Sequence, residues 1–223
     1  MCSFLFEKET MIFWDLDGPI LDVKEKYYNV YKDILLKNED TPLPKNDYWE
    51  LKRSKTAIDD ILSKSNCRLS SETFKKLWIE RIETPKYLQL DSLQPDIFEV
   101  LTLCKQKNNM VMVTLRRSKD MLLKQLDQLN LIQVFDDILS SGADIKPHWE
   151  IKYRLINEYL IGEENKNHTI IGDTETDILT GKKLGLTTVG VLTGIRGETL
   201  KLSKPDFLFK CTVDIKDYFQ QEL

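Results

Sequence analysis

Short apolar runs alternate with stretches of helical spacing along most of the chain. Apolar and β-branched runs are typical of strands buried in a parallel sheet, whereas apolar residues three and four positions apart are typical of helices packed against it. The expected strands are Met11–Trp14, Met110–Thr114, Asp137–Ser140, Thr169–Ile171, Thr187–Val191 and, more weakly, Phe207–Phe209. The expected helices between them are Ser118–Leu129, Trp149–Leu160 and Thr176–Leu184. The alternation predicts an α/β fold in three layers, with a mainly parallel, Rossmann-like sheet between two layers of helices.

The pattern changes between Asp22 and about Pro95, where we find helical spacing and no strand-like alternation. The helices expected there are Val23–Leu36, Thr56–Ser63 and Ser71–Ile82. A segment of roughly 70 residues is marginal for an independent core, so it should lean on the rest of the chain. We therefore expect a core domain of residues 1–21 and 96–223, and a small all-α domain of residues 22–95. The alternative is that these helices simply extend the core of one domain.

Composition narrows the classes of protein that the chain can belong to. The net charge of −4 is small and lysines and arginines are scattered, so no basic stripe suggests nucleic acid. No apolar run approaches the roughly 20 residues that cross a membrane, and the N-terminal segment MCSFLFEKET is too short and too acidic for a signal peptide. The four cysteines (Cys2, Cys67, Cys104, Cys211) lie far apart, so we expect reduced thiols and a cytoplasmic location.

Two carboxylates follow the first expected strand in the segment Met11–Asp22, MIFWDLDGPILD. A parallel α/β sheet carries its chemistry at the carboxyl ends of its strands. Asp15 is therefore a candidate nucleophile or metal ligand, and Asp17 is a candidate general acid and base. An Asx-turn that closes a strand explains an isolated D-x-D-G equally well, so the choice depends on the rest of the sequence.

Three later segments add polar residues at comparable positions. Thr114 ends the second expected core strand, Lys146 precedes an expected helix, and Asp173 follows another strand with Asp177 four residues later. Two like charges 4 Å apart repel by about 4 kcal/mol at an effective dielectric of 20, so converging aspartates require a cation. Carboxylate ligands without sulfur or imidazole favour a hard ion such as Mg²⁺.

These four segments, in this order, resemble the four motifs of the haloacid dehalogenase (HAD) superfamily, most members of which are Mg²⁺-dependent phosphatases. The resemblance extends from Met11 to about Arg196. It implies a HAD-like core whose helical segment 22–95 is a cap, as in phosphoglycolate phosphatase-like and β-phosphoglucomutase-like members. It also implies that Asp15 attacks phosphorus to form an aspartyl-phosphate, and that Asp17 protonates the leaving oxygen and then activates water.

The same resemblance implies roles for the remaining motif residues. Thr114 and Lys146 would bind the phosphoryl group. The Leu-Arg-Arg segment after Thr114 departs from the family's usual small or polar residues, and either Arg116 or Arg117 contacts substrate or the two form a solvated basic pair. Mg²⁺ would be held by Asp15, by the backbone carbonyl of Asp17 and by Asp173, with Asp177 orienting its water ligands. Lys152 is the alternative lysine for this role. We favour Lys146, because Pro147 suits the first position of a helix and places Lys146 directly before the helix start.

The expected function is Mg²⁺-dependent hydrolysis of a small-molecule phosphomonoester by a monomer or homodimer, without nucleic-acid or membrane partners. The dehalogenase branch lacks a carboxylate at the position of Asp17, which disfavours carbon–halogen cleavage. Three alternatives stay open: a sugar-phosphate mutase, a phosphonate hydrolase and a non-catalytic HAD-like binding protein. The phosphonate hydrolase would need a Schiff-base lysine, for which Lys52, Lys55 and Lys64 are candidates.

Overall fold

The computed structural model describes residues 10–142, 147–162 and 167–221 of the chain. Six parallel strands form one sheet in the order β5-β4-β1-β6-β7-β8. The strands are β1 (Thr10–Trp14), β4 (Asn108–Thr114), β5 (Asp137–Ser140), β6 (Thr169–Gly172), β7 (Thr187–Val191) and β8 (Phe207–Phe209). All six expected strands are present within two residues of their expected ends. The predicted α/β class is confirmed.

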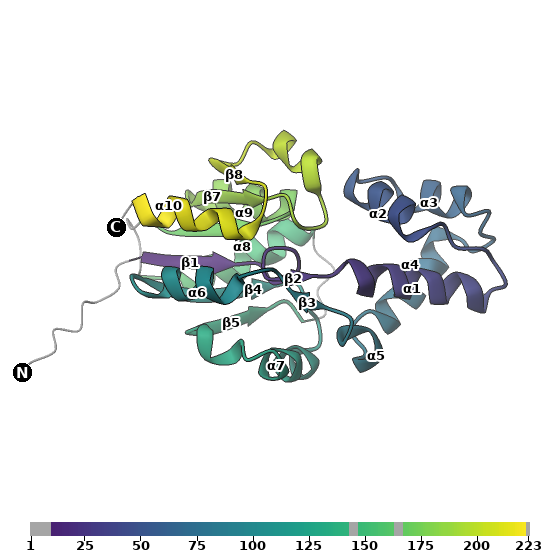
Figure 1. Cartoon of the computed structure of the whole chain (residues 1–223), viewed down its shortest axis with the longest axis horizontal. Coiled ribbons are helices and arrows are strands. Elements are labelled where there is room, and N and C mark those ends of the chain that lie inside the picture. Colours follow the sequence, from purple (N-terminus) through teal and green to yellow (C-terminus); the bar gives the residue numbers. More distant parts are fainter. Residues whose placement is uncertain (1–9, 143–146, 163–166, 222–223) are drawn as a thin grey trace, which may run out of the picture.

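Helices cover both faces of this sheet (Figure 1). They are α6 (Ile97–Lys105), α7 (Lys119–Gln128), α8 (His148–Tyr159), α9 (Glu175–Leu184) and α10 (Ile215–Gln221). Short 3₁₀ turns join them at η1 (Ile132–Val134), η2 (Gly197–Ser203) and η3 (Thr212–Asp214). Gly185 ends α9 with a positive φ of 70°, the left-handed conformation that favours glycine at a helix end.

Strand β1 lies inside the sheet and is buried on both sides. Trp14 and Ile12 pack into an apolar cluster with Ile97 and Leu122, on the face covered by α6 and α7. Phe13 points the other way, because successive side chains of a strand alternate between faces, and it joins a second cluster around α8. This double burial explains why the sequence of β1 is a continuous apolar run instead of an alternating one.

Five further helices gather at one end of the sheet (Figure 1). They are α1 (Lys24–Lys37), α2 (Lys45–Arg53), α3 (Ile58–Lys64), α4 (Ser71–Arg81) and α5 (Pro85–Leu88), together called the helical insertion below. They enclose a separate apolar cluster in which Tyr31 stacks on Tyr48 with ring centroids 4.2 Å apart. Tyr31 is fully buried there, so it serves the insertion's core.

The chain enters and leaves the insertion through two short antiparallel strands, β2 (Leu21–Asp22) and β3 (Ser92–Leu93). The sequence pattern did not predict them, because two residues are too few to show an alternation. The pattern also missed α2, whose residues are mostly charged and which buries only Tyr48 and Trp49. The expected domain boundaries near residues 22 and 95 stay a prediction.

The direction of the strands sets where chemistry can take place. The arrow of β1 points toward the insertion in Figure 1, and parallel pairing gives β4 and β6 the same direction. The carboxyl ends of these strands therefore face the insertion.

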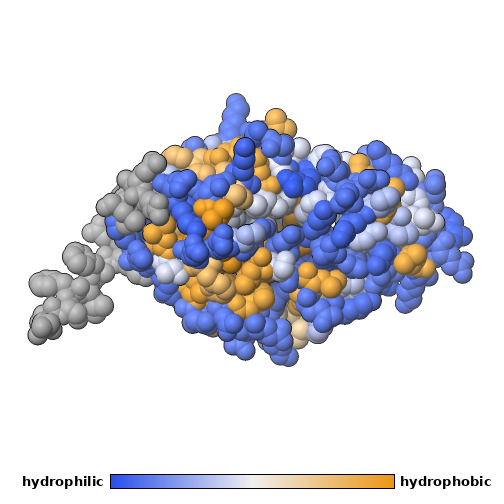
Figure 2. All heavy atoms as spheres, in the orientation of Figure 1, coloured by the Kyte–Doolittle hydropathy of each residue, from blue (hydrophilic) through white to orange (hydrophobic). Residues whose placement is uncertain are grey.

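Figure 2 shows mostly hydrophilic residues over the insertion on the visible face, with smaller hydrophobic patches. Among the described helices, none has both the length and the apolar character needed to cross a membrane.

Candidate active site

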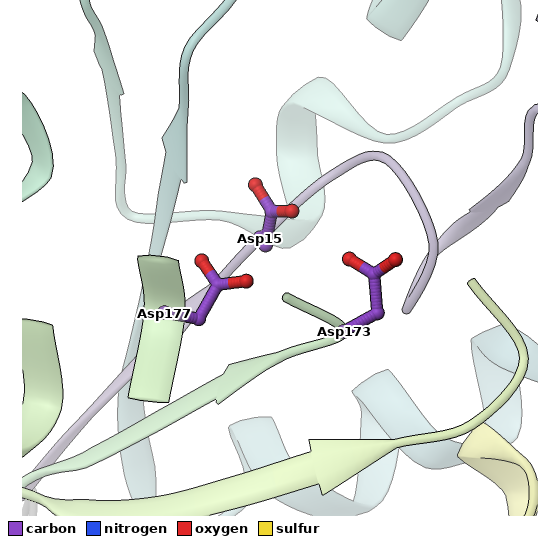
Figure 3. Close-up of side chains that lie close together, drawn as sticks. All are labelled: Asp15, Asp173 and Asp177. Atoms are coloured by element: carbon purple, nitrogen blue, oxygen red, sulfur yellow. The ribbon is translucent and has the colours of Figure 1, made fainter. Parts of the chain in front are cut away.

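Three aspartates converge at the carboxyl edge of the sheet. Asp15 directly follows β1, Asp173 directly follows the neighbouring strand β6, and Asp177 lies in the first turn of α9. One carboxylate oxygen from each lies within 4.8 Å of the others, and Figure 3 shows the three groups close together. Asp173 and Asp177 are fully buried and Asp15 is 9% exposed. The sequence favoured a meeting of Asp15, Asp17, Asp173 and Asp177, and the structure brings together the carboxylates of Asp15, Asp173 and Asp177.

The start of α9 holds Asp177 in place. The backbone N–H and the hydroxyl of Thr174 donate to Oδ2 of Asp177 at 3.0 and 2.7 Å. This reciprocal capping box satisfies backbone groups that a helix start leaves without intrahelical partners. With Oδ2 occupied, Oδ1 of Asp177 is the oxygen that turns to its neighbours.

Asp173 has one oxygen bound and one free. The backbone N–H of Ile195 donates to Oδ2, whereas Oδ1 is buried without a hydrogen-bond partner among the described residues. A buried polar atom without a partner is costly, and a hard cation bound by oxygen would satisfy it. Gly18 approaches the same carboxylate with a φ of 114°, and a Cβ at this position would overlap Asp173.

Lys152 is the positive charge beside this group of aspartates. Its ammonium is buried on α8 and donates to Oδ1 of Asp15 at 2.7 Å and to Oδ1 of Asp177. Burial by itself lowers the pKa of a lysine, but the carboxylates of Asp15 and Asp177 outweigh it and raise the pKa. Lys152 is therefore protonated and shared between two aspartates.

The position of Lys152 had a signal in the sequence. It lies four residues before the buried Ile156, and residues with this spacing share one face of a helix. A lysine on a core-facing stripe is seldom buried unless it is paired. Lys146, which the sequence analysis favoured, lies outside the residues that the structure describes, so its role stays a prediction.

The charge of the three aspartates is only partly balanced by Lys152. Burial raises the pKa of Asp15 to about 7; Lys152 opposes the shift and Asp177 adds to it. Burial, Asp15 and Asp177 together raise the pKa of Asp173 well above its usual range. A divalent cation reverses such shifts because it stabilises the ionised carboxylates. Donor type, burial and the free oxygen of Asp173 thus all fit a metal ion.

Thr114 lies at the same edge. It is the last residue of β4, which pairs with β1, and it is buried. Its hydroxyl accepts a hydrogen bond from the backbone N–H of Arg116 at 3.3 Å. Within the described ranges this hydroxyl donates no hydrogen bond, so its proton is available for another acceptor at this edge of the sheet.

The comparisons with known proteins agree with this arrangement. The family model described as haloacid dehalogenase-like hydrolase matches residues 12–191. The chain belongs to this family. A phosphoglycolate phosphatase from Aquifex aeolicus is 27% identical to this HAD-family hydrolase over 220 residues, which cover 92% of this chain and 94% of that protein.

Solved structures of the family share its fold. A haloacid dehalogenase-like hydrolase from Streptococcus pneumoniae superposes with a TM-score of 0.74 at 20% identity, covering 94% of this chain and 98% of that one. A HAD-superfamily hydrolase of subfamily IA from Geobacter sulfurreducens gives 0.67 at 16% identity, covering 96% and 98%. The predicted family, fold and enzyme class are confirmed.

Asp17 has different neighbours from the other motif aspartates of this HAD-family hydrolase. Nε and Nη2 of Arg116 donate to its two oxygens at 2.8 and 2.6 Å, and Lys26 lies 3.4 Å away. Burial raises the pKa of a carboxyl, but Arg116 and Lys26 outweigh it and hold the pKa of Asp17 well below its usual range. The side chain of Asp17 is therefore ionised and paired with cations.

A second buried carboxylate completes this group. Oδ2 of Asp91 accepts from Lys26 at 2.7 Å, from Arg116 at 3.0 Å and from Gln125 at 2.8 Å. We call Asp17, Lys26, Asp91, Arg116 and Gln125 the Asp17 network. Arg116 is 6% exposed, so the solvated alternative is wrong for it. The sequence analysis missed Lys26, Asp91 and Gln125, which have no local motif.

Proposed function

We propose that the protein is a Mg²⁺-dependent phosphatase that hydrolyses a small-molecule phosphomonoester through an aspartyl-phosphate on Asp15. The observation that carries the proposal is the buried group of Asp15, Asp173 and Asp177 with one lysine shared between two of them. Such a group suits an anionic substrate only if a cation offsets the repulsion. The name of the Aquifex aeolicus relative supports a phosphate ester as substrate.

Asp15 and Asp173 would hold the metal, together with the backbone carbonyl of Asp17, and Asp177 would orient its water ligands. Bound Mg²⁺ would offset the charges of nucleophile and phosphoryl group and hold them in line. The unpartnered Oδ1 of Asp173 supports this assignment.

Asp15 would supply the nucleophile. Lys152 engages Oδ1 of Asp15, so we assign the attack on phosphorus to Oδ2. A bond forms between this oxygen and phosphorus while the bond from phosphorus to the ester oxygen breaks. Thr114 would donate its hydroxyl proton to a phosphoryl oxygen. We assign the motif-three ammonium to Lys152 in place of Lys146, because Lys152 contacts the nucleophile.

Asp17 would transfer the protons. It would give a proton to the leaving oxygen and later take one from the water that attacks the aspartyl-phosphate, which releases phosphate and restores Asp15. A carboxylate paired with Arg116 and Lys26 is ionised, so it must loosen these contacts to carry a proton. We propose that movement of α1 withdraws Lys26 from Asp17, that Arg116 turns away from Asp17 in the same step, and that the helical insertion acts as a cap.

Phosphate release tests the function directly. The panel consists of sugar phosphates, nucleotides, 2-phosphoglycolate and an aryl phosphate, each with Mg²⁺ and with EDTA, and with Asp15→Asn as the inactive control. We expect release with Mg²⁺ that falls to background in EDTA and in the variant, because the nucleophile and its metal are lost. Release that persists in Asp15→Asn would exclude the covalent mechanism.

A further inference from the structure

Lys52 lies where the helical insertion contacts the core. It lies in the last turn of α2. The next residue, Arg53, donates from Nη2 to the carbonyl of Leu192 at 2.7 Å, and its own carbonyl accepts from the hydroxyl of Thr199 at 3.0 Å. Leu192 follows β7 and Thr199 lies in η2. The end of α2 is therefore fastened to the core, which limits the places that the Lys52 side chain can reach.

Aromatic rings surround the ammonium of Lys52. Its Nζ lies 5.3 Å from the ring centroid of Tyr27 and 5.6 Å from that of Trp78. Tyr27 and Trp78 pack edge to face with centroids 5.2 Å apart. Ring faces attract a cation through their quadrupole, but they carry no charge and leave the ammonium unneutralised.

The ammonium of Lys52 lacks a counter-ion in the part of the chain that the structure describes. Among the described residues, no carboxylate lies within 4.0 Å of its ammonium. Glu175, which Lys55 contacts just after the end of α2, already pairs with Lys55 and Arg196 at 2.7 Å each. Burial, followed by the charge of Arg196, lowers the pKa of Lys52 to about 8.

The other buried cations near the site are paired. Lys26 and Arg116 each contact Asp17 and Asp91, and Lys152 contacts Asp15 and Asp177. A partly buried cation without a carboxylate is costly unless an anion reaches it. Lys52 thus differs from Lys26, Arg116 and Lys152, because its charge is not neutralised by a carboxylate of the described residues.

Tyr27 connects this lysine with the reaction site. Its neighbour on α1, Lys26, contacts Asp17. Burial raises the pKa of the Tyr27 phenol, and the charges of Asp17 and Asp173 raise it further. Tyr27 thus links the two places: its ring contacts the ammonium of Lys52, and the adjacent Lys26 contacts Asp17.

We propose that Lys52 binds a second anionic group of the substrate, a carboxylate or a second phosphate, at the end opposite the phosphoryl group. This inference rests on the proposed phosphatase function. The phosphoryl group would occupy the site at Asp15, and the rings of Tyr27 and Trp78 would flank the path between it and Lys52. The substrate class is then a small phosphomonoester with an additional negative charge.

The test compares three esters of similar size with different far ends. They are 2-phosphoglycolate, which ends in a carboxylate, ethylene glycol bisphosphate, which ends in a phosphate, and ethyl phosphate, which ends in a methyl group. The variants are Lys52→Gln and Lys52→Arg. Lys64→Gln is the matched control, since Lys64 is an exposed lysine at the end of α3.

We expect the wild type to prefer an ester with an anionic far end. Loss of a charge-assisted hydrogen bond in Lys52→Gln should lower kcat/KM for that ester by about 10- to 100-fold, mainly through KM. Ethyl phosphate should change by less than about threefold, because its far end makes no such bond. Lys52→Arg should restore part of the loss, and Lys64→Gln should match the wild type.

Two results would overturn the inference: an equal loss for all three esters, which indicates a structural role, or no loss for either anionic ester. Wild-type protein that releases phosphate best from ethyl phosphate would also overturn it while leaving the phosphatase function intact. No release from any ester, in this or the larger panel, would instead count against the proposed function.

Calorimetry tests Lys52 without turnover. In the Asp15→Asn background with Mg²⁺, 2-phosphoglycolate should bind at least about tenfold more weakly once Lys52→Gln is added. Ethyl phosphate should bind equally to both variants. Equal affinity of the two variants for 2-phosphoglycolate would refute the role of Lys52 whatever the catalytic result, whereas binding of neither ester would count against the proposed function.

Discussion

Lys152 balances the charge of the candidate active site. Its ammonium contacts Asp15 and Asp177 from a fully buried position, where Coulomb interactions are stronger than in water. The side chain of a helical residue points back toward the start of its helix. This direction lets Lys152 reach the sheet edge from the second turn of α8, which begins at His148.

Replacing Lys152 by methionine should therefore abolish most activity. We expect Lys152→Met to lower kcat by about 100- to 1,000-fold, because the variant loses a preorganised positive charge beside the reacting group. Phosphate release under saturating Mg²⁺ measures the effect, and circular dichroism checks that the variant folds.

Lys146→Met is the matched control for this prediction. If Lys152 is the motif-three lysine, the Lys146 variant should keep its activity to within about twofold, because Lys146 then has no part in the reaction. The reverse pattern, with loss in Lys146→Met alone, would return the role to Lys146 and contradict the assignment made from the contacts of Lys152.

At the scale of elements, the Asp17 network joins the helical insertion to the core. Lys26 comes from α1, Asp91 from the segment between α5 and β3, and Arg116 from the loop after β4. Each of the two cations contacts both carboxylates. Buried charges of this kind contribute little net stability when complete, but losing one partner is expensive.

Asp91→Asn should therefore destabilise the fold. Removing this charge leaves Lys26 and Arg116 with Asp17 as their shared anion, and we expect the free energy of unfolding to fall by about 3–5 kcal/mol. Urea denaturation measures the change. Asp59→Asn, an exposed aspartate on α3, is the control and should stay within about 0.5 kcal/mol of the wild type.

Removing a cation as well should recover part of the loss. In Asp91→Asn/Lys26→Met the uncompensated ammonium is gone, so the double variant should be more stable than Asp91→Asn. If Asp91→Asn is as stable as Asp59→Asn, Asp91 is not a structural counter-ion.

For the whole molecule, the buried aspartates link stability to pH and metal. The pKa of Asp15 is raised from 3.8 to about 7, and that of Asp173 is raised too. In this range the metal-free folded protein keeps protons that the unfolded chain has released. We therefore expect its stability to fall as pH rises from about 4 to about 7, by at most about 1.4 kcal/mol per pH unit for each group.

Thermal unfolding between pH 5 and pH 8 tests this link. In EDTA, Tm should decrease with rising pH, and in Mg²⁺ the decrease should be smaller or absent, because the cation stabilises the ionised form. Asp15→Asn in EDTA should show a shallower decrease, since one titrating group is missing. A wild-type Tm that rises with pH in EDTA would contradict the raised pKa values.

The sequence by itself determined the sheet and the meeting of Asp15, Asp173 and Asp177. Apolar runs identify buried parallel strands, and residues that follow neighbouring strands meet at one edge, as Asp15 and Asp173 do. Asp177 follows at the start of the next helix. These relations depend on local periodicity, which a single chain displays. Cytoplasmic location and a monomeric or dimeric state stay predictions.

Tertiary structure alone decided which side chains the buried lysines meet. Lys26 and Asp91 are separated by 65 residues and become neighbours where the helical insertion returns to the core. Lys152 reaches Asp15 across 137 residues because of the rotation of α8 against the sheet. Lys52 takes its place beside Tyr27 through the docking of α2. Such pairings follow from the packing of whole elements, and no spacing along the chain encodes them.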